Sequence, residues 1–183
     1  MLFRSGLNSK LTASADHPLK MYVGDVEASG RMSQIMALEK QGKYYTFLDK
    51  ENLEKQIPYL NKKYPSAASM AGLTVEQLFG KKLDSFALFE AYSLASTALI
   101  NDGKGHFHPA PLPYQVQWSP VYAFALADLD GDGKADLLTG GDFFGTQPFE
   151  GRYDAMPLAI HHGDGHGDFK SVLPLPTDRK SVV

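Results

Sequence analysis

The sequence of 183 residues contains no cysteine, no long apolar run and no excess of basic residues. Without cysteine, a disulfide scaffold, a thiolate zinc site and a cysteine nucleophile are excluded, although the compartment stays open. The 18 Lys and Arg residues are outnumbered by 21 Asp and Glu residues, which argues against a nucleic acid partner. No apolar run approaches the roughly 20 residues of a membrane span, and Met1 to Lys10 lacks the features of a signal peptide.

The residues that are present favour strands joined by turns. The chain has 17 glycines and 11 prolines, and its β-branched and aromatic runs are bounded by Gly and Asp clusters. The segment from about Asp49 to Phe86 instead has the Lys, Glu, Gln, Leu and Ala content of helices. Asp49 is a suitable N-cap, and Thr74 with Gln77 has the capping-box spacing. We expect a helical insertion there, acting either as a lid or partner-binding element or as a structural plug over a sheet edge.

A long internal repeat organises the rest of the chain. The stretch VYAFALADLDGDGKADLLTGG in the second half corresponds to LKMYVGDVEASGRMSQIMAL in the first. Each copy then reaches an Asp-Gly-x-Gly turn, within IHHGDGHGDFKSVLPLP and LINDGKGHFHPAPLP respectively. Asp128 and Phe169 are 41 residues apart, whereas the equivalent Asp25 and Phe107 are 82 residues apart. The first copy is therefore longer by about the length of the helical insertion.

The repeat predicts a mainly β fold, a partial β-propeller of about two four-stranded blades with a short α-helical insertion. The expected parts are residues 1–18 as the remnant of a preceding blade or a linker, 19–113 as the first blade with the insertion at about 49–86, 119–176 as the second blade with the acidic loop 128–136, and 177–183 as a tail. Closed propellers need at least about four blades. We therefore expect the remaining propeller blades, or self-association, to protect the open blade edges.

The loop from Asp128 to Asp136, DLDGDGKAD, carries the most specific chemical signal. Carboxylates at its first, third, fifth and ninth positions, with the Lys134 carbonyl between them, can converge on one Ca²⁺ ion. The alternative is a solvated Asp-Gly turn, which does not explain four acids at this spacing. An EF-hand is disfavoured because its twelfth position would be Thr139 and both flanks are typical of strands. The expected ligands are Asp128, Asp130, Asp132, Lys134 and Asp136.

The equivalent loop of the first copy has fewer acids. It keeps Asp25 and Glu27, but Ser29 stands at the next acidic position and Arg31 adds a positive charge. Because calcium affinity depends on the number of charged ligands, we expect this degenerate loop to be metal-free.

These motifs resemble the FG-GAP/VCBS repeats, the β-propeller blades of integrin α-subunits and of cartilage acidic protein with its bacterial relatives. The resemblance rests on ALADLDGDGKADLLTGG followed by HHGDGHGDF, and on NDGKGHFHPAPLP, and it covers nearly the whole chain outside the insertion. It implies that the loop 128–136 joins the first two strands of a blade and binds calcium through the residues named above. It also implies an extracellular, cell-surface or periplasmic location. Ser29 and Ser33 depart from the family pattern, so it transfers no ligands to the first loop.

The histidines are the next candidates for a metal site. His106 and His108 share one face of a strand, whereas His161 and His162 point to opposite faces, so three converging ligands are not expected even with His166 nearby. Positions on the surface of hairpins are favoured over a zinc or nickel site.

The loop 142–155 combines aromatic and charged side chains, as recognition loops do. Its candidate ligand-binding residues are Phe143, Phe144, Glu150, Arg152, Tyr153 and Asp154. Local packing of the aromatic side chains is an equally weighted alternative.

Catalysis has little support, because the chain lacks a G-x-S-x-G elbow, an H-E-x-x-H helix, a P-loop and a dinucleotide fingerprint. The leading hypothesis is a non-catalytic, calcium-binding, extracellular module for adhesion or interaction with a protein or glycan at a cell surface. The alternative is a carbohydrate-binding or polysaccharide-active propeller that uses the loop 142–155. A third is a purely structural segment.

Overall fold

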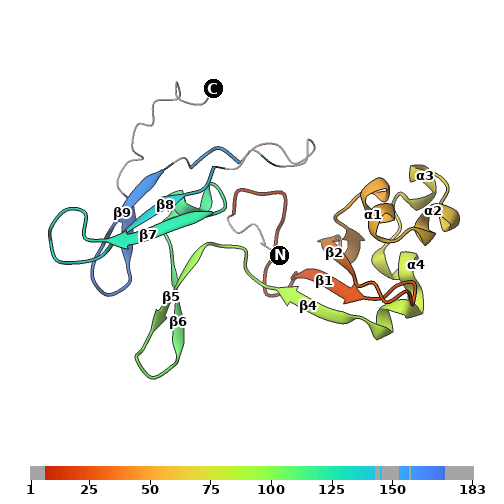
Figure 1. The fold of residues 1–183 in the computed structure, drawn as a ribbon, viewed down its shortest axis with the longest axis horizontal. Coiled ribbons are helices and arrows are strands. Elements are labelled where there is room, and N and C mark those ends of the chain that lie inside the picture. The colour runs from red at the N-terminus through yellow and green to blue at the C-terminus, as the bar shows by residue number, and fades with distance from the viewer. Residues whose placement is uncertain (1–6, 143–144, 146–152, 157, 172–183) are drawn as a thin grey trace. The chain divides into compact units, whose positions relative to one another are not determined.

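The computed structural model describes residues 7–142, 145, 153–156 and 158–171 (Figure 1). The protein is mainly β, with 33% strand and 20% helix, so the predicted fold class is confirmed at that level. The strands of the described residues form three antiparallel sheets, none of them closed, and the partial propeller stays a prediction. The chain divides into two compact units. Unit 1 comprises Met1–Lys10 and Leu94–Val183, and unit 2 comprises Leu11–Ser93.

Unit 2 is built on a four-stranded antiparallel sheet with the strand order β3-β2-β1-β4. Its strands are β1 (Leu19–Gly24), β2 (Ser33–Lys40), β3 (Lys43–Thr46) and β4 (Ala87–Ala91). On β2, the alternate residues Ser33, Ile35 and Ala37 are buried, which is the two-residue period of a strand with one covered face.

Helices follow β3 and end before β4. They are α1 (Lys50–Gln56), α2 (Tyr59–Lys63), α3 (Ala67–Met70), α4 (Val75–Phe79) and the 3₁₀ helix η1 (Gly80–Ser85). They lie within the range that the sequence predicts for the helical insertion. Asp49 caps α1 by accepting the backbone N–H of Asn52 at 2.9 Å, and Thr74 and Gln77 form a reciprocal capping box at α4. Within the described part of the chain, no helix combines the length and the apolar character that crossing a membrane requires.

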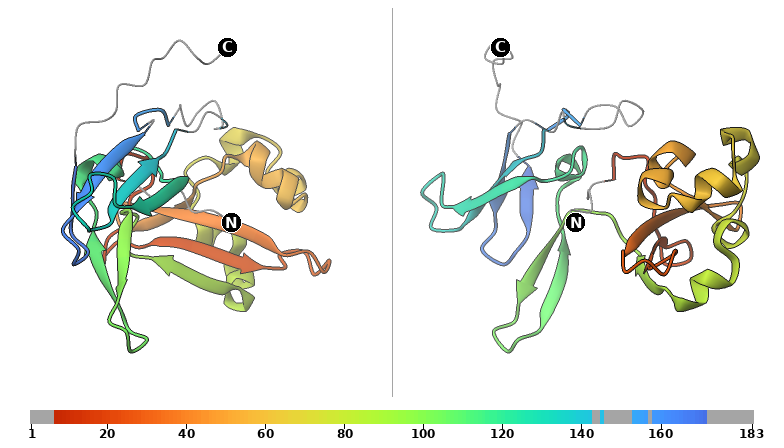
Figure 2. Two further views of the ribbon diagram at one scale, coloured as in Figure 1. Left: turned by 60° about the vertical axis from the view of Figure 1, so that its left-hand side comes forward. Right: turned by 45° about the vertical axis from the view of Figure 1, so that its right-hand side comes forward.

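The helices and the sheet of unit 2 share one hydrophobic core. Figure 2 shows the helices gathered beside this sheet. The strands and the loop after β1 contribute Tyr22, Val26, Ile35 and Ala37, and the helical segment contributes Leu53, Ile57, Leu60, Met70, Val75, Leu78 and Phe79. Since the helices cover the inward face of the sheet, this packing favours the structural plug over the lid among the two interpretations of the insertion.

The first predicted blade needs a correction, because residues 19–113 do not form one four-stranded sheet. The internal repeat predicts that the strands around Leu99 and Phe107 join β1 and β2 in one sheet, but in the structure β3 pairs with β2 and β4 pairs with β1. Gln41 and Gly42 have φ angles of 54° and 77°, as in the two-residue type I′ turns of hairpins. This turn brings β3 back along β2. β3 therefore occupies the edge of β2 that the third strand of the predicted blade would have taken.

Unit 1 contains a four-stranded antiparallel sheet within the region predicted as the second blade. Its strands β7 (Ala123–Ala127), β8 (Asp136–Gly140), β9 (Ala159–Gly163) and β10 (Phe169–Ser171) pair in chain order. Each strand pairs with its neighbour in sequence, as expected for one blade. The end of the predicted blade, 172–176, and the tail, 177–183, lie outside the described residues.

Unit 1 also contains the hairpin of β5 (Thr97–Asn101) and β6 (Phe107–Pro111), followed by the 3₁₀ helix η2 (Tyr114–Gln117). The turn of this hairpin and the β9–β10 turn have the same geometry. The N–H of Asp102 donates to the carbonyl of His106 at 3.0 Å, and the N–H of Asp164 donates to the carbonyl of Asp168 at 3.0 Å. In both turns the aspartate Oδ1 accepts the N–H groups two and four residues further on. The two Asp-Gly-x-Gly signatures therefore form equivalent turns.

Leu78→Ala should destabilise unit 2. Leu78 is fully buried in the core that the helices share with the sheet. Truncating a buried leucine typically costs about 3 kcal/mol, because a cavity remains. We expect urea denaturation monitored by circular dichroism to show a loss of this size. The control is Glu76→Gln, at an exposed position of α4, which should change the free energy of unfolding by less than about 0.5 kcal/mol. Equal stability of the two variants would contradict the shared core.

Candidate metal centre

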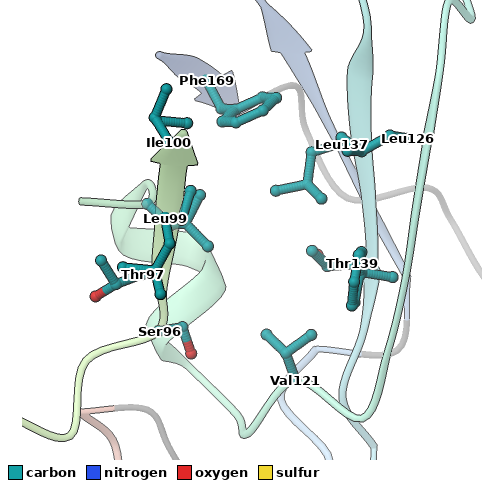
Figure 3. A pocket seen from close by; sticks show the side chains of 12 residues that line it. Ser96, Thr97, Leu99, Ile100, Val121, Leu126, Leu137, Thr139 and Phe169 are labelled. Carbon is teal, nitrogen blue, oxygen red and sulfur yellow. The ribbon is translucent and has the colours of Figure 1, made fainter. Parts of the chain in front are cut away.

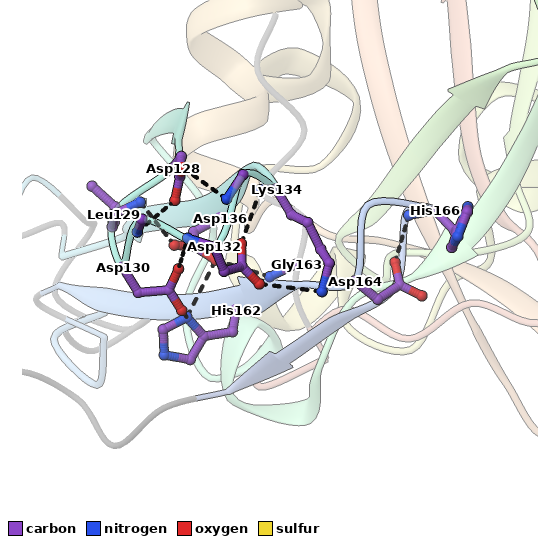
Figure 4. Close-up of polar contacts among 12 residues, drawn as sticks. Asp128, Leu129, Asp130, Asp132, Lys134, Asp136, His162, Gly163, Asp164 and His166 are labelled. Atoms are coloured by element: carbon purple, nitrogen blue, oxygen red, sulfur yellow. Dashed lines mark hydrogen bonds and ion pairs between the residues drawn. The ribbon is translucent and has the colours of Figure 1, made fainter.

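The acidic loop connects β7 to β8 in unit 1 (Figure 4). It curls tightly because Gly131 and Gly133 adopt φ angles of 80° and 83°, which glycine tolerates without strain. Their N–H groups donate to the two carboxylate oxygens of Asp128 at 2.8 and 3.0 Å. Asp130 and Asp132 accept the N–H groups two residues further on, at 3.0 and 2.9 Å. The backbone of the loop thus holds each of these acids in place.

Three of the predicted ligands converge. Asp128, Asp130 and Asp132 are exposed, and each places a carboxylate oxygen within 4.8 Å of the other two. Negative charges at this spacing repel each other unless a cation lies among them. The donors of this group are all oxygens, the ligand type that Ca²⁺ prefers. The residues present therefore fit the ion that the sequence predicts.

Asp136, the fourth predicted acid, is buried, with only 1% of its surface exposed. Its Oδ1 accepts the N–H of Gly163 and its Oδ2 accepts the N–H of Leu129, both at 3.0 Å. The hydrogen bonds from Gly163 and then Leu129 hold the pKa of Asp136 below its ordinary value. A side chain at position 163 would collide with the carbonyl of Ala135, so glycine permits this approach of β9 to the loop. Asp136, at the end of the loop, therefore links Leu129 at the start of the loop to Gly163 on β9.

His162 joins the acids from the neighbouring strand β9. Its Nδ1 lies 3.2 Å from Oδ2 of Asp130 and 3.2 Å from Oδ1 of Asp136 (Figure 4). The sequence predicts a hairpin-surface position for this histidine and gives no sign of its contact with the acidic loop. The pairing of Leu137 with His161 between β8 and β9 sets the next pair, Asp136 and His162, opposite each other. This register depends on the pairing of two strands that are distant in the sequence, so the motif of the acidic loop does not predict it.

Lys134 binds Asp132 through both its backbone amide and its side-chain ammonium group. Its backbone N–H donates to Asp132 at 2.9 Å, and its Nζ lies 3.2 Å from the same carboxylate. The backbone hydrogen bond, followed by the ammonium group, lowers the pKa of Asp132. The role of the Lys134 carbonyl as a ligand stays a prediction.

His161 lies on the opposite face of β9 and is fully buried. The Nε2 atom of its ring is 2.9 Å from the hydroxyl oxygen of Thr139 on β8. Burial lowers the pKa of this imidazole. The predicted divergence of His161 and His162 is therefore correct, whereas the predicted surface position is wrong for His161.

The first-copy loop uses its acids for hydrogen bonds within unit 2. Asp25 accepts the N–H groups of Glu27, Ser29 and Gly30, at 3.2, 3.1 and 2.6 Å. Glu27 turns to the helical segment, where its carboxylate accepts the N–H of Tyr59 at the start of α2, at 2.7 Å. The two acids of the degenerate loop thus have separate structural roles.

The recognition loop of the sequence analysis is described only in part. Phe143, Phe144, Glu150 and Arg152 lie outside the described residues. Tyr153 and Asp154 line a largely polar cavity of about 380 Å³ in unit 1. Its other lining residues are Asn8, Ser9, Lys10, Trp118 and Ala155.

A second cavity of unit 1, of about 470 Å³, is mostly apolar. Figure 3 shows side chains of β5, among them Leu99, across from side chains of β8, among them Leu137. Phe124 and Leu126 of β7 also line this cavity, and 72% and 57% of their surfaces are exposed. Unit 1 therefore carries apolar strand residues that its own described residues do not cover.

The acidic loop lies within a segment that matches the model of a known repeat family. The model of the FG-GAP repeat matches residues 120–155, which contain β7, the acidic loop and β8. The predicted resemblance to the FG-GAP repeat is therefore confirmed for this segment, and the first copy lies outside the match. No curated protein and no solved structure matches the chain.

Asp25→Asn should make unit 2 less sensitive to acid. The N–H groups of Ser29, Gly30 and Glu27 lower the pKa of Asp25 from its ordinary value of 3.8. A carboxyl group with a lowered pKa in the folded state stabilises the fold above its unfolded pKa, and this contribution is lost as the pH falls through the folded pKa. Urea denaturation between about pH 6 and pH 2 should therefore show a flatter loss of stability in the variant below about pH 4. Asp84→Asn, at an exposed position of η1, should keep the wild-type slope.

Proposed function

We propose that the chain is a non-catalytic calcium-binding module, with Asp128, Asp130 and Asp132 as the centre of the site. The observation that carries the proposal is the convergence of these three carboxylates within 4.8 Å. Asp136 and the Lys134 carbonyl complete the oxygen ligands that the sequence analysis assigned. An oxygen-rich, negatively charged loop favours Ca²⁺ over softer metal ions.

The role of the ion in this proposal is structural. Calcium offsets the repulsion among the acids of a loop that connects β7 to β8. Because Asp136 is hydrogen-bonded to Gly163, the same loop is linked to β9 as well. Binding at the loop would therefore stiffen three strands of the sheet of unit 1.

The proposed biological role is adhesion or interaction with a protein at a cell surface. An FG-GAP repeat suggests an integrin-like β-propeller module, and such repeats are typical of extracellular proteins. Exposed apolar residues of β7, above all Phe124 and Leu126, support association with a further blade, a second copy or a protein partner. An extracellular, cell-surface or periplasmic location belongs to the same proposal.

Asp130→Asn should abolish calcium binding, because Asp130 belongs to the converging carboxylates. We expect isothermal titration calorimetry to detect Ca²⁺ binding to the wild type and to lose the signal in the variant. Calcium at about 100 times the dissociation constant should stabilise the wild type by about 2.7 kcal/mol in urea denaturation. Asp25→Asn is the matched control and should bind calcium as the wild type does. A wild type that does not bind Ca²⁺, or an Asp130→Asn variant that binds it normally, would overturn the proposal.

Glycan binding is the second candidate function, supported by the cavity that Trp118 lines together with Tyr153 and Asp154. Aromatic rings beside polar groups suit the apolar faces and the hydroxyl groups of sugars. On a glycan array, Trp118→Ala should lower the signal of any glycan that the wild type binds by at least about tenfold. Analysis of the bound glycan for products separates binding from turnover, and the proposal of a non-catalytic module predicts no products. A wild type that binds no glycan leaves a protein partner as the ligand.

A further inference from the structure

His162 gives the acidic loop a nitrogen donor that an all-oxygen calcium site does not need. Its Nδ1 atom is shared between a carboxylate oxygen of Asp130 and one of Asp136. We propose that Asp130, Asp136 and His162 form a second metal site, which takes a transition divalent cation of the zinc type. This inference does not depend on calcium binding, because its ligand set and its preferred ion differ.

The spacing of the three donor atoms fits such an ion. In a tetrahedral zinc site, nitrogen and oxygen ligands lie about 2.0–2.1 Å from the metal, so neighbouring ligand atoms are about 3.3 Å apart. The Nδ1 atom of His162 is 3.2 Å from each of its two carboxylate neighbours, and all three donor atoms lie within 4.8 Å of one another. An ion can therefore bind with small movements of the side chains.

The buried member of the site is held in position. Asp136 is 1% exposed, and two backbone N–H groups, of Leu129 and Gly163, fix the orientation of its carboxylate. Directly before His162, the buried His161 contacts Thr139 and holds β9 against β8. The backbone on both sides of the site is thus positioned before any ion binds, which limits the entropy lost on binding.

The other two members leave the site open to solvent. The side chains of His162 and Asp130 are 44% and 41% exposed. An ion can enter from the solvent, and water can occupy the fourth position, as in zinc sites with three protein ligands. Imidazole nitrogen is a good ligand for zinc, copper, iron and nickel but not for calcium, so His162 determines the preference for the transition ion.

The two metal sites share Asp130 and Asp136 but not all their ligands. Asp128 and Asp132 belong to the all-oxygen group alone, whereas His162 belongs to the mixed group alone. Variants at Asp128 and His162 can therefore separate the two sites. Both side chains are at the surface, and circular dichroism can check that each variant folds.

The test is isothermal titration calorimetry of Zn²⁺ and Ca²⁺, added separately to the wild type and to His162→Ala and Asp128→Asn. His162→Ala should weaken Zn²⁺ binding by at least about tenfold, because one of three protein ligands is lost, and should change Ca²⁺ binding by less than about twofold. Asp128→Asn should have the opposite pattern. His108→Ala, at an exposed position of β6, is the control for zinc bound at other surface histidines and should bind Zn²⁺ as the wild type does.

Cobalt gives an independent readout. Co²⁺ in a tetrahedral site with a nitrogen ligand should give visible absorption bands in the wild type, and these should disappear in His162→Ala. Zinc binding that is unchanged by His162→Ala, or a wild type that binds no Zn²⁺, would overturn the inference. Loss of calcium binding with zinc binding retained would overturn the proposed calcium module alone, so the two failures can be distinguished.

Discussion

The hydrogen bonds from backbone N–H groups to an aspartate at the start of a turn are the interaction on which both units depend. They recur at Asp25, Asp102, Asp128 and Asp164, each of which accepts N–H groups from residues two to five positions further on. Glycines with positive φ make the curl that turns those N–H groups toward the carboxylate. Each turn therefore fixes the connection between two segments locally, and the aspartate that opens it has a defined position without help from a distant part of the chain.

The two units bury their apolar residues to different degrees. In unit 2 the helical segment covers the sheet, and the shared core includes fully buried residues from α1, α2 and α4. In unit 1 every residue of β7 is exposed, although β8 beside it is largely buried. A sheet with an exposed apolar edge strand is prone to pair or pack with another chain. Unit 1 is therefore the part of the molecule better suited to association, which agrees with the proposed interaction module.

Local signals in the sequence predicted local structure well. The caps at Asp49 and Thr74, the two Asp-Gly-x-Gly turns and the curl of the acidic loop all depend on residues within a few positions of each other. Pairings between distant segments were not predictable in this way. β3 takes the place beside β2 where the strand around Leu99 was expected, and β4 pairs with the other side of β1. A short Gln-Gly turn is the local sign of the β2–β3 pairing. His162 was missed because its distance from the acids depends on the register of β8 and β9, which no local motif encodes.

Glu27 shows what happens to a repeated loop when another element is inserted beside it. Its carboxylate accepts the N–H of Tyr59, and Lys82 donates to the neighbouring carbonyl of Val26 at 2.8 Å. Both contacts attach the loop to the helical segment. The same carboxylate oxygen cannot hold the start of α2 and coordinate an ion at full strength, so the two uses compete. Restoring a metal site in this copy by adding acids would consequently weaken the attachment of the helices. The loop therefore serves to hold the helical insertion in place.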